Sequence, residues 1–591
     1  MSRDGAEAVR AIVCQVEDVR PPQYISFGRY RMNDKGLALI APEGKGNAQT
    51  TAFKLISGPF EILGRVRDPN GEGWARLLRW SDDDKRVHRH AISDADLHGD
   101  ISALCGKLAG LGLRITTGPT RAYFVGYLND IVVKNRVTVV TTTGWHKIGA
   151  AMVFALPDHT IGSVADEKVI VQGANASPFD SRGTLAEWQN SVGLLAAGHS
   201  RPLLAVSASL AGPLLGLLGM EGGGFNLYGQ SSRGKTTIAQ AAASVWGKGD
   251  SPGFVRPWRS TANALEAAAA MHTDTILVLD ELGAVDPKEA AMAIYALTSG
   301  TGKTRMKRDT SLRSSMTWRV LVLSTGEVTL TDKIEENRQR ARAGQQVRLV
   351  DIPADAGTGF GAFDNGGAAG DAKVLADQIK AAAQTFYGTA GPEFVSRLIA
   401  DRILANDIKT MMDAFRKNHT PKAADGQVLR VMDRFGLVAV AGELACDLGI
   451  VPWRKGDALE AARRCFVDWF NVRGGAEAGE SQTAIAQVRL FMDRHGDARF
   501  EPVEPTSDRP VNNRAGWRKG DGPGRQWLIP PEIWKSEVAV GLNPILVAKA
   551  LAERGMLKRA SGGFQCVERI QGIPQRVYIV TASILSEPGH E

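Results

Sequence analysis

The sequence predicts an α/β protein built around a parallel sheet that is wound with helices. Between residues 222 and 353, the short apolar runs GFNLYG, TILVLDE, WRVLVLST and QVRLVDIP alternate with helical stretches such as KTTIAQAAASVWG. This alternation is typical of parallel sheets covered by helices. The first run leads into GQSSRGKT, a glycine-containing turn between a strand and a helix. We therefore place an α/β core at residues 183–371.

The composition is that of an ordinary globular protein. The chain has 591 residues, of which 43% are hydrophobic and 23% charged, so several domains are expected. Lysine and arginine number 71 against 64 for aspartate and glutamate, a net charge of +7. This excess suits a polyanionic partner without requiring one. The five cysteines form no C-x-x-C pair, which argues against a disulfide framework and a structural zinc site.

The expected location is the cytoplasm, with no membrane contact. The N-terminal residues lack an apolar stretch long enough for a signal peptide. One uncharged segment, Pro202–Met220, has about the length that crosses a bilayer. Its small residues and the central Pro213 make it weakly hydrophobic, and it runs almost directly into the strand before Gly229. We predict a buried core helix there.

The segments before the core read as strands. Residues 1–54 form a short N-terminal extension. Over residues 55–182, runs such as FEILGRV and RVTVVTTTGWH are separated by the turn sequences DPNGEG and SDDDK. A mostly β or α+β domain is expected at 55–182.

The segments after the core are predicted as a helical lid and support region at 372–500 and a winged-helix-like domain at 501–591. In the latter, Asn543-Pro544 starts a helix that ends at Gly555, and two β runs follow. A DNA-binding winged helix and a small α+β cap that touches no nucleic acid both fit this pattern.

The motif GQSSRGKT predicts a phosphate-binding loop. It matches G-x-x-x-x-G-K-[ST], in which backbone N–H groups cradle phosphates, the lysine reaches the β- and γ-phosphates, and the following hydroxyl binds Mg²⁺. The start of the next helix adds its positive dipole end. The predicted ATP-binding residues are Gly229, Gln230, Ser231, Ser232, Arg233, Gly234, Lys235, Thr236 and Thr237.

A second motif extends the prediction from binding to hydrolysis. The apolar strand TILVLDE delivers Asp280 to the metal and Glu281 to the attacking water. Thr236 and Asp280 are the predicted Mg²⁺ ligands, so ATP and Mg²⁺ are the expected cofactors. A buried strand that merely ends in a solvated acidic pair would explain neither the order nor the spacing of the two motifs.

The strand after these motifs ends in Ser324-Thr325-Gly326-Glu327. A small polar group at this point would hold the lytic water beside the γ-phosphate. Ser324 is the first choice for this sensor and Thr325 the second. The alternative is a hydroxyl that only caps a helix or turn.

A basic segment, RQRARAG at residues 338–344, precedes the last core strand. Ring-forming ATPases present an arginine to the neighbour's γ-phosphate from this position, and such a finger acts in trans. Arg342 is the first candidate and Arg340 the second. The alternative is a solvated basic loop. A finger in trans would require a homo-oligomer.

The segment GTGKTRMKRDTSLRSSMTWR carries one acid among many basic residues. On an extended hairpin, alternate side chains share one face and could follow a phosphate backbone without reading sequence. A solvated loop is the alternative. The candidate DNA-binding residues are Lys303, Arg305, Lys307, Arg308 and Arg313.

The chain resembles the domain-of-unknown-function-927 family of phages, islands and staphylococcal cassette elements, which includes replicative helicases resembling MCM. The resemblance covers roughly residues 55–500. It is carried by PFEILGRVRD, WARLLRWSD, GWH, AGPLLGLLGMEGGGFNLYGQSSRGKTTIAQAAASVWG, WRSTANALE, LVLDE, STGE and ARAGQQVRLVDIP, then by AGELA, WFNVRGG and HGDARF.

The resemblance implies an AAA+ ATPase related to superfamily 3 and MCM helicases, which assembles as a hexameric ring around DNA with ATP sites between subunits. By position, Lys235, Thr236, Asp280 and Glu281 are the ATP machinery and Ser324 the sensor. The segment Lys303–Arg313 occupies the place of the pre-sensor-1 hairpin that grips DNA.

Two further points concern the family. The TANALE residues Thr261, Asn263 and Glu266 look like a family motif, but no chemistry follows from them. Some relatives carry a primase or zinc module. The short N-terminal extension has neither the length nor the metal-ligand spacing for one, so any primase is expected to be a separate protein.

Three classes of function share a nucleotide site of this kind. The leading one is an ATP-dependent DNA helicase for replication of a phage or mobile element, acting on a single strand or fork. The rival is an ATP-dependent DNA-binding switch or assembly factor that shares the ATP-site residues and never unwinds DNA. A metabolic P-loop kinase is disfavoured because no acceptor-substrate site is apparent.

Overall fold

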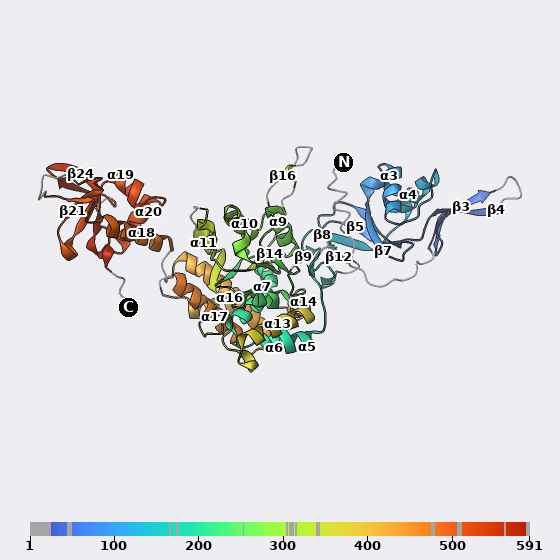
Figure 1. Ribbon diagram of the computed structural model, residues 1–591. Coiled ribbons are helices and arrows are strands. Elements are labelled where there is room, and N and C mark those ends of the chain that lie inside the picture. The colour runs from blue at the N-terminus through green and yellow to red at the C-terminus, as the bar shows by residue number, and fades with distance from the viewer. Residues whose placement is uncertain are drawn as a thin grey trace. The chain divides into compact units, whose positions relative to one another are not determined.

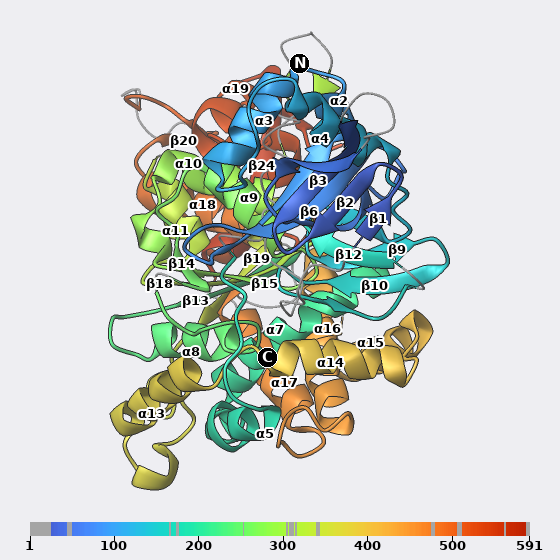
Figure 2. The same ribbon diagram turned by 90° about the vertical axis from the view of Figure 1, so that its right-hand side faces the viewer.

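The structure is a computed structural model, shown in Figures 1 and 2. It divides into two units: the first runs to Thr420 and resumes over Arg430–Trp469, and the second comprises Pro421–Leu429 and the residues from Phe470 onward. The structure describes residues 25–43, 50–164, 167–172, 177–251, 253–302, 305–306, 312–313, 316–337, 343–422, 424–473, 479–504, 511–560 and 563–586.

The N-terminal part of the first unit contains strands and helices, as expected for an α+β arrangement. A 4-stranded antiparallel sheet consists of β1 (Ile25–Phe27), β2 (Tyr30–Asn33), β3 (Gly36–Glu43) and β4 (Thr50–Ser57). A 5-stranded sheet follows, in the order β12 (Glu167–Val171), β8 (Arg136–Val140), β5 (Glu61–Arg67), β6 (Ala75–Ser81) and β7 (Val87–Ser93). The accompanying helices are α2 (Asp94–Leu97), α3 (Ile101–Gly110) and α4 (Thr120–Asp130).

A smaller sheet leads from this part toward the core. It has 3 strands in the order β11 (Thr160–Ile161), β10 (Ala151–Ala155) and β9 (Gly144–Ile148). Trp145 of β9 packs edge to face on Phe154 of β10, and Phe154 stacks on Trp246, which follows the first core helix. Such aromatic pairs contribute about 0.5–1.5 kcal/mol beyond the area they bury. They attach the small sheet to the core.

The core is a 5-stranded parallel sheet, which confirms the predicted α/β class. Its strand order is β14 (Val255–Pro257), β15 (Ile276–Asp280), β18 (Leu321–Gly326), β13 (Gly223–Tyr228) and β19 (Leu349–Pro353). β18 therefore separates β13, which leads into GQSSRGKT, from β15, which ends in Asp280. The helices between these strands are α8 (Lys235–Ala243), α9 (Ala262–Met271), α10 (Pro287–Ser299), α11 (Leu330–Glu335) and α12 (Ala343–Gln346).

Helix α7 (Ser200–Leu218) is the predicted core helix. It is long and apolar enough to cross a membrane, but 83% of its most apolar window is buried inside the protein. A Cβ added at Gly212 would lie 2.5 Å from the Cα of Thr275, so the helix backbone packs directly beside the residue that precedes β15. This close approach explains the small residues that make the segment weakly hydrophobic.

The chain after the core is mainly helical, and its last part adds a sheet. The helices are α13 (Ala372–Thr385), α14 (Ala390–Ala400), α15 (Ala405–His419), α16 (Gly426–Asp447), α17 (Asp457–Arg473) and α18 (Gly479–His495). The last 5-stranded sheet has the order β20 (Phe500–Pro502), β21 (Gly516–Lys519), β22 (Gln526–Ile529), β24 (Ile573–Thr581) and β23 (Cys566–Ile570).

The expected helix and β hairpin of the second unit are present. α20 (Pro544–Glu553) begins with Asn543, whose side chain accepts the backbone N–H groups of Ile545 and Leu546, and Pro544 occupies the first turn. β23 and β24 then pair antiparallel. Whether this unit binds DNA stays a prediction.

Candidate nucleotide-binding site

The loop after β13 has the backbone that the P-loop motif predicts. Gly229, Ser232 and Gly234 have φ angles of 149°, 60° and 90°. At Gly234 an added Cβ would come within 2.9 Å of the Phe363 ring, so glycine is needed for space as well as for its backbone angle. α8 starts at the next residue, and no side chain caps its start. Its first N–H groups are therefore left for an anion.

Lys235 lies folded back over this loop. Its side chain is buried, and Nζ donates to the backbone carbonyls of Gly229 at 2.8 Å and Gln230 at 2.7 Å. Burial lowers the pKa of Lys235, while the carboxylates of Glu327, Glu281 and Asp280 oppose that shift. Within the part of the chain that the structure describes, the ammonium group has carbonyl partners but no carboxylate within bonding distance, which suits a group that exchanges partners for phosphate oxygens.

Three oxygen-bearing side chains meet beside the P-loop. The hydroxyl of Thr236 lies 3.2 Å from Oδ2 of Asp280. The hydroxyl of Thr325, from β18, donates to Oδ1 of the same carboxylate. Mg²⁺ prefers hard oxygen ligands and binds through one or two carboxylates with substrate phosphates and water. The residues present therefore fit a magnesium ion, with Thr236 and Asp280 as the protein ligands.

Glu281 follows in an unusual backbone conformation. Its φ and ψ angles are 67° and 65°, the left-handed region that non-glycine residues rarely adopt. It precedes the short 3₁₀ helix Leu282–Ala284, and its side chain is exposed. Strained backbone persists where the surrounding structure enforces it and is frequent at active sites. At this turn the side chain of Glu281 is exposed, whereas the carboxylate of Asp280 contacts Thr236 and Thr325.

The geometry distinguishes the two sensor candidates. Ser324 is fully buried, accepts a hydrogen bond from the indole of Trp258 at 2.9 Å and donates to Oδ1 of Asn226 at 2.8 Å. Its neighbour Thr325 instead contacts Asp280. Successive side chains on a strand point to opposite faces, so only one of the two can face the acidic pair. The geometry favours Thr325, the second choice, over Ser324.

A buried polar network that the sequence motifs did not predict lies behind Ser324. Asn226 of β13 donates from Nδ2 to Oδ1 of Asp351 at 2.7 Å, and Asp351 also accepts the backbone N–H of Leu330 at 3.0 Å. Burial raises the pKa of Asp351 to about 7, with the hydrogen bonds opposing it. The sequence signal for this network is Asn226, a single amide side chain inside the apolar run GFNLYG.

The remaining predicted residues are only partly described. Arg340 and Arg342 lie outside the described residues, as do Lys303, Lys307 and Arg308. The backbone of the other two candidates is described. β16 (Arg305–Met306) pairs antiparallel with β17 (Leu312–Arg313), so Arg305 lies opposite Arg313.

The base of this hairpin is also visible. Thr301 and Thr317 form an antiparallel bridge, and the N–H of Gly302 donates to the carbonyl of Met316 at 2.9 Å. The expected extended hairpin between α10 and β18 is therefore present. Its contact with DNA stays a prediction.

A second feature missed from the sequence is a buried joint at the amino ends of the core strands. Asp274, which precedes β15, is fully buried and accepts Nε and Nη2 of Arg319, each at 2.9 Å. It also accepts the backbone N–H of Trp145 at 3.0 Å. Trp145 Nε1 donates to the carbonyl of Pro213 in α7 at 2.8 Å. The small N-terminal sheet is thus bonded to both β15 and α7.

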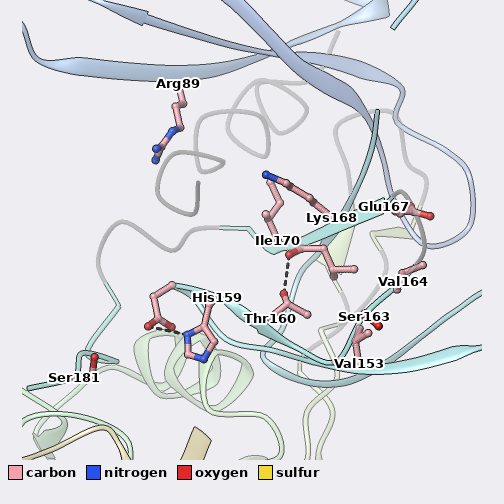
Figure 3. Close-up of a pocket in the computed structure, with 13 residues that line it drawn as sticks. Arg89, Val153, His159, Thr160, Ser163, Val164, Glu167, Lys168, Ile170 and Ser181 are labelled. Carbon is pink, nitrogen blue, oxygen red and sulfur yellow. Dashed lines mark hydrogen bonds and ion pairs between the residues drawn. The ribbon is translucent and has the colours of Figure 1, made fainter. Parts of the chain in front are cut away.

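A cavity of about 830 Å³ lies in the N-terminal part of the first unit (Figure 3). Arg89 of β7 and Lys168 of β12 extend toward it from different strands. On its other side Nδ1 of His159 lies 3.0 Å from Oδ2 of Asp158. Glu167 also lines the cavity, but its carboxylate is engaged by Arg67 at 3.0 Å. These charges are dispersed and do not converge on one point.

Residues 30–317 match the model of a family described as a domain of unknown function, DUF927. No curated protein matches the chain.

Two solved structures are similar to the chain. One is SCCmec type IV Cch, described as an active helicase, with 18% sequence identity and a TM-score of 0.71; the match covers 95% of this chain and 100% of that chain. The other is NtrX from Brucella abortus in complex with ATP, with 13% identity and a TM-score of 0.17 over 60% of this chain and 66% of that chain, too low to support any argument. The first likeness shows that nearly the whole chain shares the fold of a protein described as a helicase.

Proposed function

We propose that the chain is an ATP-hydrolysing DNA helicase of a phage or other mobile genetic element, working in the cytoplasm as a ring-forming AAA+ motor of the MCM and superfamily 3 type. The observation that carries the proposal is the convergence of Lys235, Thr236, Asp280 and Thr325 at the carboxyl ends of three parallel strands. The likeness in fold to a protein described as an active helicase supports it.

Within this site the residues have distinct roles. The loop amides and the open start of α8 bind the phosphates, and Lys235 turns from the carbonyls of Gly229 and Gln230 toward phosphate oxygens. Thr236 and Asp280 hold Mg²⁺, which when bound neutralises charge that develops on the phosphates. Glu281 orients the attacking water and accepts its proton. Thr325 fixes the rotamer of Asp280 through its hydrogen bond.

The motor part of the proposal rests on two basic segments. The hairpin that contains β16 and β17 emerges from the amino end of β18, whose other end carries Thr325. Lys303, Arg305, Lys307, Arg308 and Arg313 are proposed to grip a DNA strand through its phosphates. Arg342 or Arg340 is proposed to complete the ATP site of a neighbouring subunit in a hexamer.

The proposal is tested by reversing the charge of the hairpin. The triple variant Lys303→Glu, Arg305→Glu and Lys307→Glu is expected to bind nucleotide like the wild type, because these residues are remote in sequence from the P-loop. It is expected to lose DNA-stimulated ATP hydrolysis and strand separation. Unchanged unwinding by the triple variant contradicts the role of the hairpin. An active ATPase that never separates strands, under varied salt and fork designs, favours a non-unwinding switch or assembly factor.

A further inference from the structure

A second cavity lies at the edge strand of the core sheet, away from the P-loop. It has a volume of about 420 Å³ and is lined by residues from β14, from the first turns of α9 and from the segment that leads into the core. β15 and β18 separate β14 from the P-loop strand β13. The cavity is therefore distinct from the proposed ATP site.

Arg256, the middle residue of β14, lines this cavity. It is half-buried, and its Nε is buried without a hydrogen-bond partner among the described residues. Burial lowers the pKa of Arg256, and among the described residues no carboxylate opposes the shift. A buried N–H of a charged group without an acceptor is costly, so an arginine in this state points to a ligand of opposite charge.

The residues behind Arg256 cannot neutralise it. His272 is fully buried, and burial together with the charge of Arg256 lowers its pKa to about 3, so its ring is uncharged. The rings of Phe254 and Phe179 lie 4.9 Å and 5.2 Å from this imidazole. Behind the guanidinium group the wall is thus apolar or neutral. The charge is left for the open side of the cavity.

The open side offers one further hydroxyl donor for an anion. Ser177 lines the cavity and its Oγ accepts the backbone N–H of Phe179, which leaves its proton available, whereas the hydroxyl of Ser260 donates to the carbonyl of Pro257 at 3.3 Å. Ala264 and Leu265 from the start of α9 also line the cavity. α9 has 10 residues, and the side chain of Thr261 caps it by accepting the N–H of Ala264. The positive end of its dipole therefore adjoins the cavity. This gives Thr261, the first residue of the TANALE motif, a structural role.

We propose that this cavity is a phosphate-binding site in which the guanidinium group of Arg256 is the main donor, with the Ser177 hydroxyl and the start of α9 beside it. Arginine matches phosphate geometry through two parallel N–H groups, which lysine cannot do. The phosphate comes either from a nucleic-acid strand or from a free nucleotide or inorganic phosphate. Only the nucleic-acid source rests on the proposed function; the phosphate chemistry does not.

The deciding experiment compares the full-length wild type with Arg256→Gln. The matched control is Arg259→Gln, because Arg259 is an exposed arginine close by in the sequence that does not line the cavity. Three affinities are measured: fluorescent single-stranded DNA by anisotropy across a salt series, a fluorescent ATP analogue, and inorganic phosphate by its effect on Tm. The phosphate arm uses a Lys235→Ala background, which removes the P-loop lysine.

Loss of affinity in any arm that is specific to Arg256→Gln supports the site. For DNA we expect binding about five- to tenfold weaker and a log–log salt slope smaller by about 0.7, the value for one phosphate contact on a single strand. A loss confined to inorganic phosphate or nucleotide identifies a free phosphate as the ligand. Arg259→Gln is expected to bind like the wild type in every arm.

The proposal is overturned if Arg256→Gln matches the wild type in all three arms, which makes Arg256 a packing residue. If Arg256→Gln fails to fold, Arg256→Lys decides, because it keeps the charge and loses the fork; unchanged affinities in that variant overturn the proposal equally. The phosphate arm does not depend on unwinding. A wild type that hydrolyses ATP without separating strands therefore contradicts the proposed function and leaves this test intact.

Discussion

The two ends of the core strands are built in opposite ways. At the carboxyl ends, the side chains of Lys235 and Asp280 bond, among the described residues, only to loop carbonyls and threonine hydroxyls, and Glu281 is exposed. At the amino ends, the buried Asp274 is fully engaged by Arg319 and Trp145. The first arrangement can change partners when a ligand arrives, whereas the second is costly to open.

The same two strands carry both arrangements. β15 begins two residues after Asp274 and ends at Asp280. β18 begins two residues after Arg319 and ends directly after Thr325. Arg319 also follows the basic hairpin. We infer that the carboxyl ends of the core strands respond to nucleotide, whereas their amino ends fix the basic hairpin and the small N-terminal sheet to the core. The two ends thus have different functions. Four predictions test this difference.

The largest effect is expected at the carboxyl ends. Lys235→Ala removes the ammonium group that is proposed to stabilise the γ-phosphate, so phosphate release should fall by more than about a hundredfold. The Tm should change little, because Lys235 bonds only to loop carbonyls. Phosphate release and Tm are measured on the same preparation. Retained hydrolysis would show that this loop is not the ATP site.

At the amino ends the expected effect is on stability. Asp274→Ala leaves the N–H of Trp145 and the guanidinium group of Arg319 without their acceptor, so the free energy of unfolding should fall by about 3 kcal/mol. Urea titration measures this change. Glu460→Ala is the control, since it breaks an exposed pair with Arg463 and should cost less than about 1 kcal/mol. Equal costs for the two variants contradict a built joint.

The third prediction separates the two faces of β18. Thr325→Val keeps the size of the side chain and removes the hydroxyl on Asp280, so kcat should fall about tenfold or more with little loss of stability. Ser324→Ala leaves the indole N–H of Trp258 without an acceptor and should cost about 1–3 kcal/mol of stability, with a smaller effect on kcat. The reverse pattern restores Ser324 as the sensor.

The last prediction concerns pH. The pKa of Asp351 is about 7 in the folded protein and about 3.9 in an unfolded chain. The folded state therefore holds a proton that the unfolded state has lost between these values, so this group makes stability fall as pH rises from about 4 to 7. Asp351→Asn should flatten that dependence. Urea midpoints at pH 5 and pH 8 measure it, and an unchanged slope assigns the dependence elsewhere.

What the sequence could predict depended on how far apart the interacting residues lie. GQSSRGKT and TILVLDE were recognisable because each motif is contiguous and each backbone conformation is local. The joint and the buried network were not, because Trp145 and Asp274 are 129 residues apart and Asn226 and Asp351 are 125 apart. Such contacts depend on which strands become neighbours, and that order is a property of the folded chain.

The choice between Ser324 and Thr325 could not be made from the sequence for a different reason. Both residues end the same strand, and the alternation of faces along a strand does not say which face meets the acidic pair. β18 is buried throughout, so its burial pattern carries no alternation to read. Only the position of Asp280 on the neighbouring β15 distinguishes the two hydroxyls.

The central claim is that ATP hydrolysis at the carboxyl ends of the core strands drives separation of DNA strands. It is tested most directly by a forked duplex with one labelled strand, incubated with the wild type or with Lys235→Ala in the presence of ATP and Mg²⁺. We expect the wild type to release the labelled strand only with ATP, and Lys235→Ala to release none. Efficient ATP hydrolysis by the wild type without strand release would contradict the central claim.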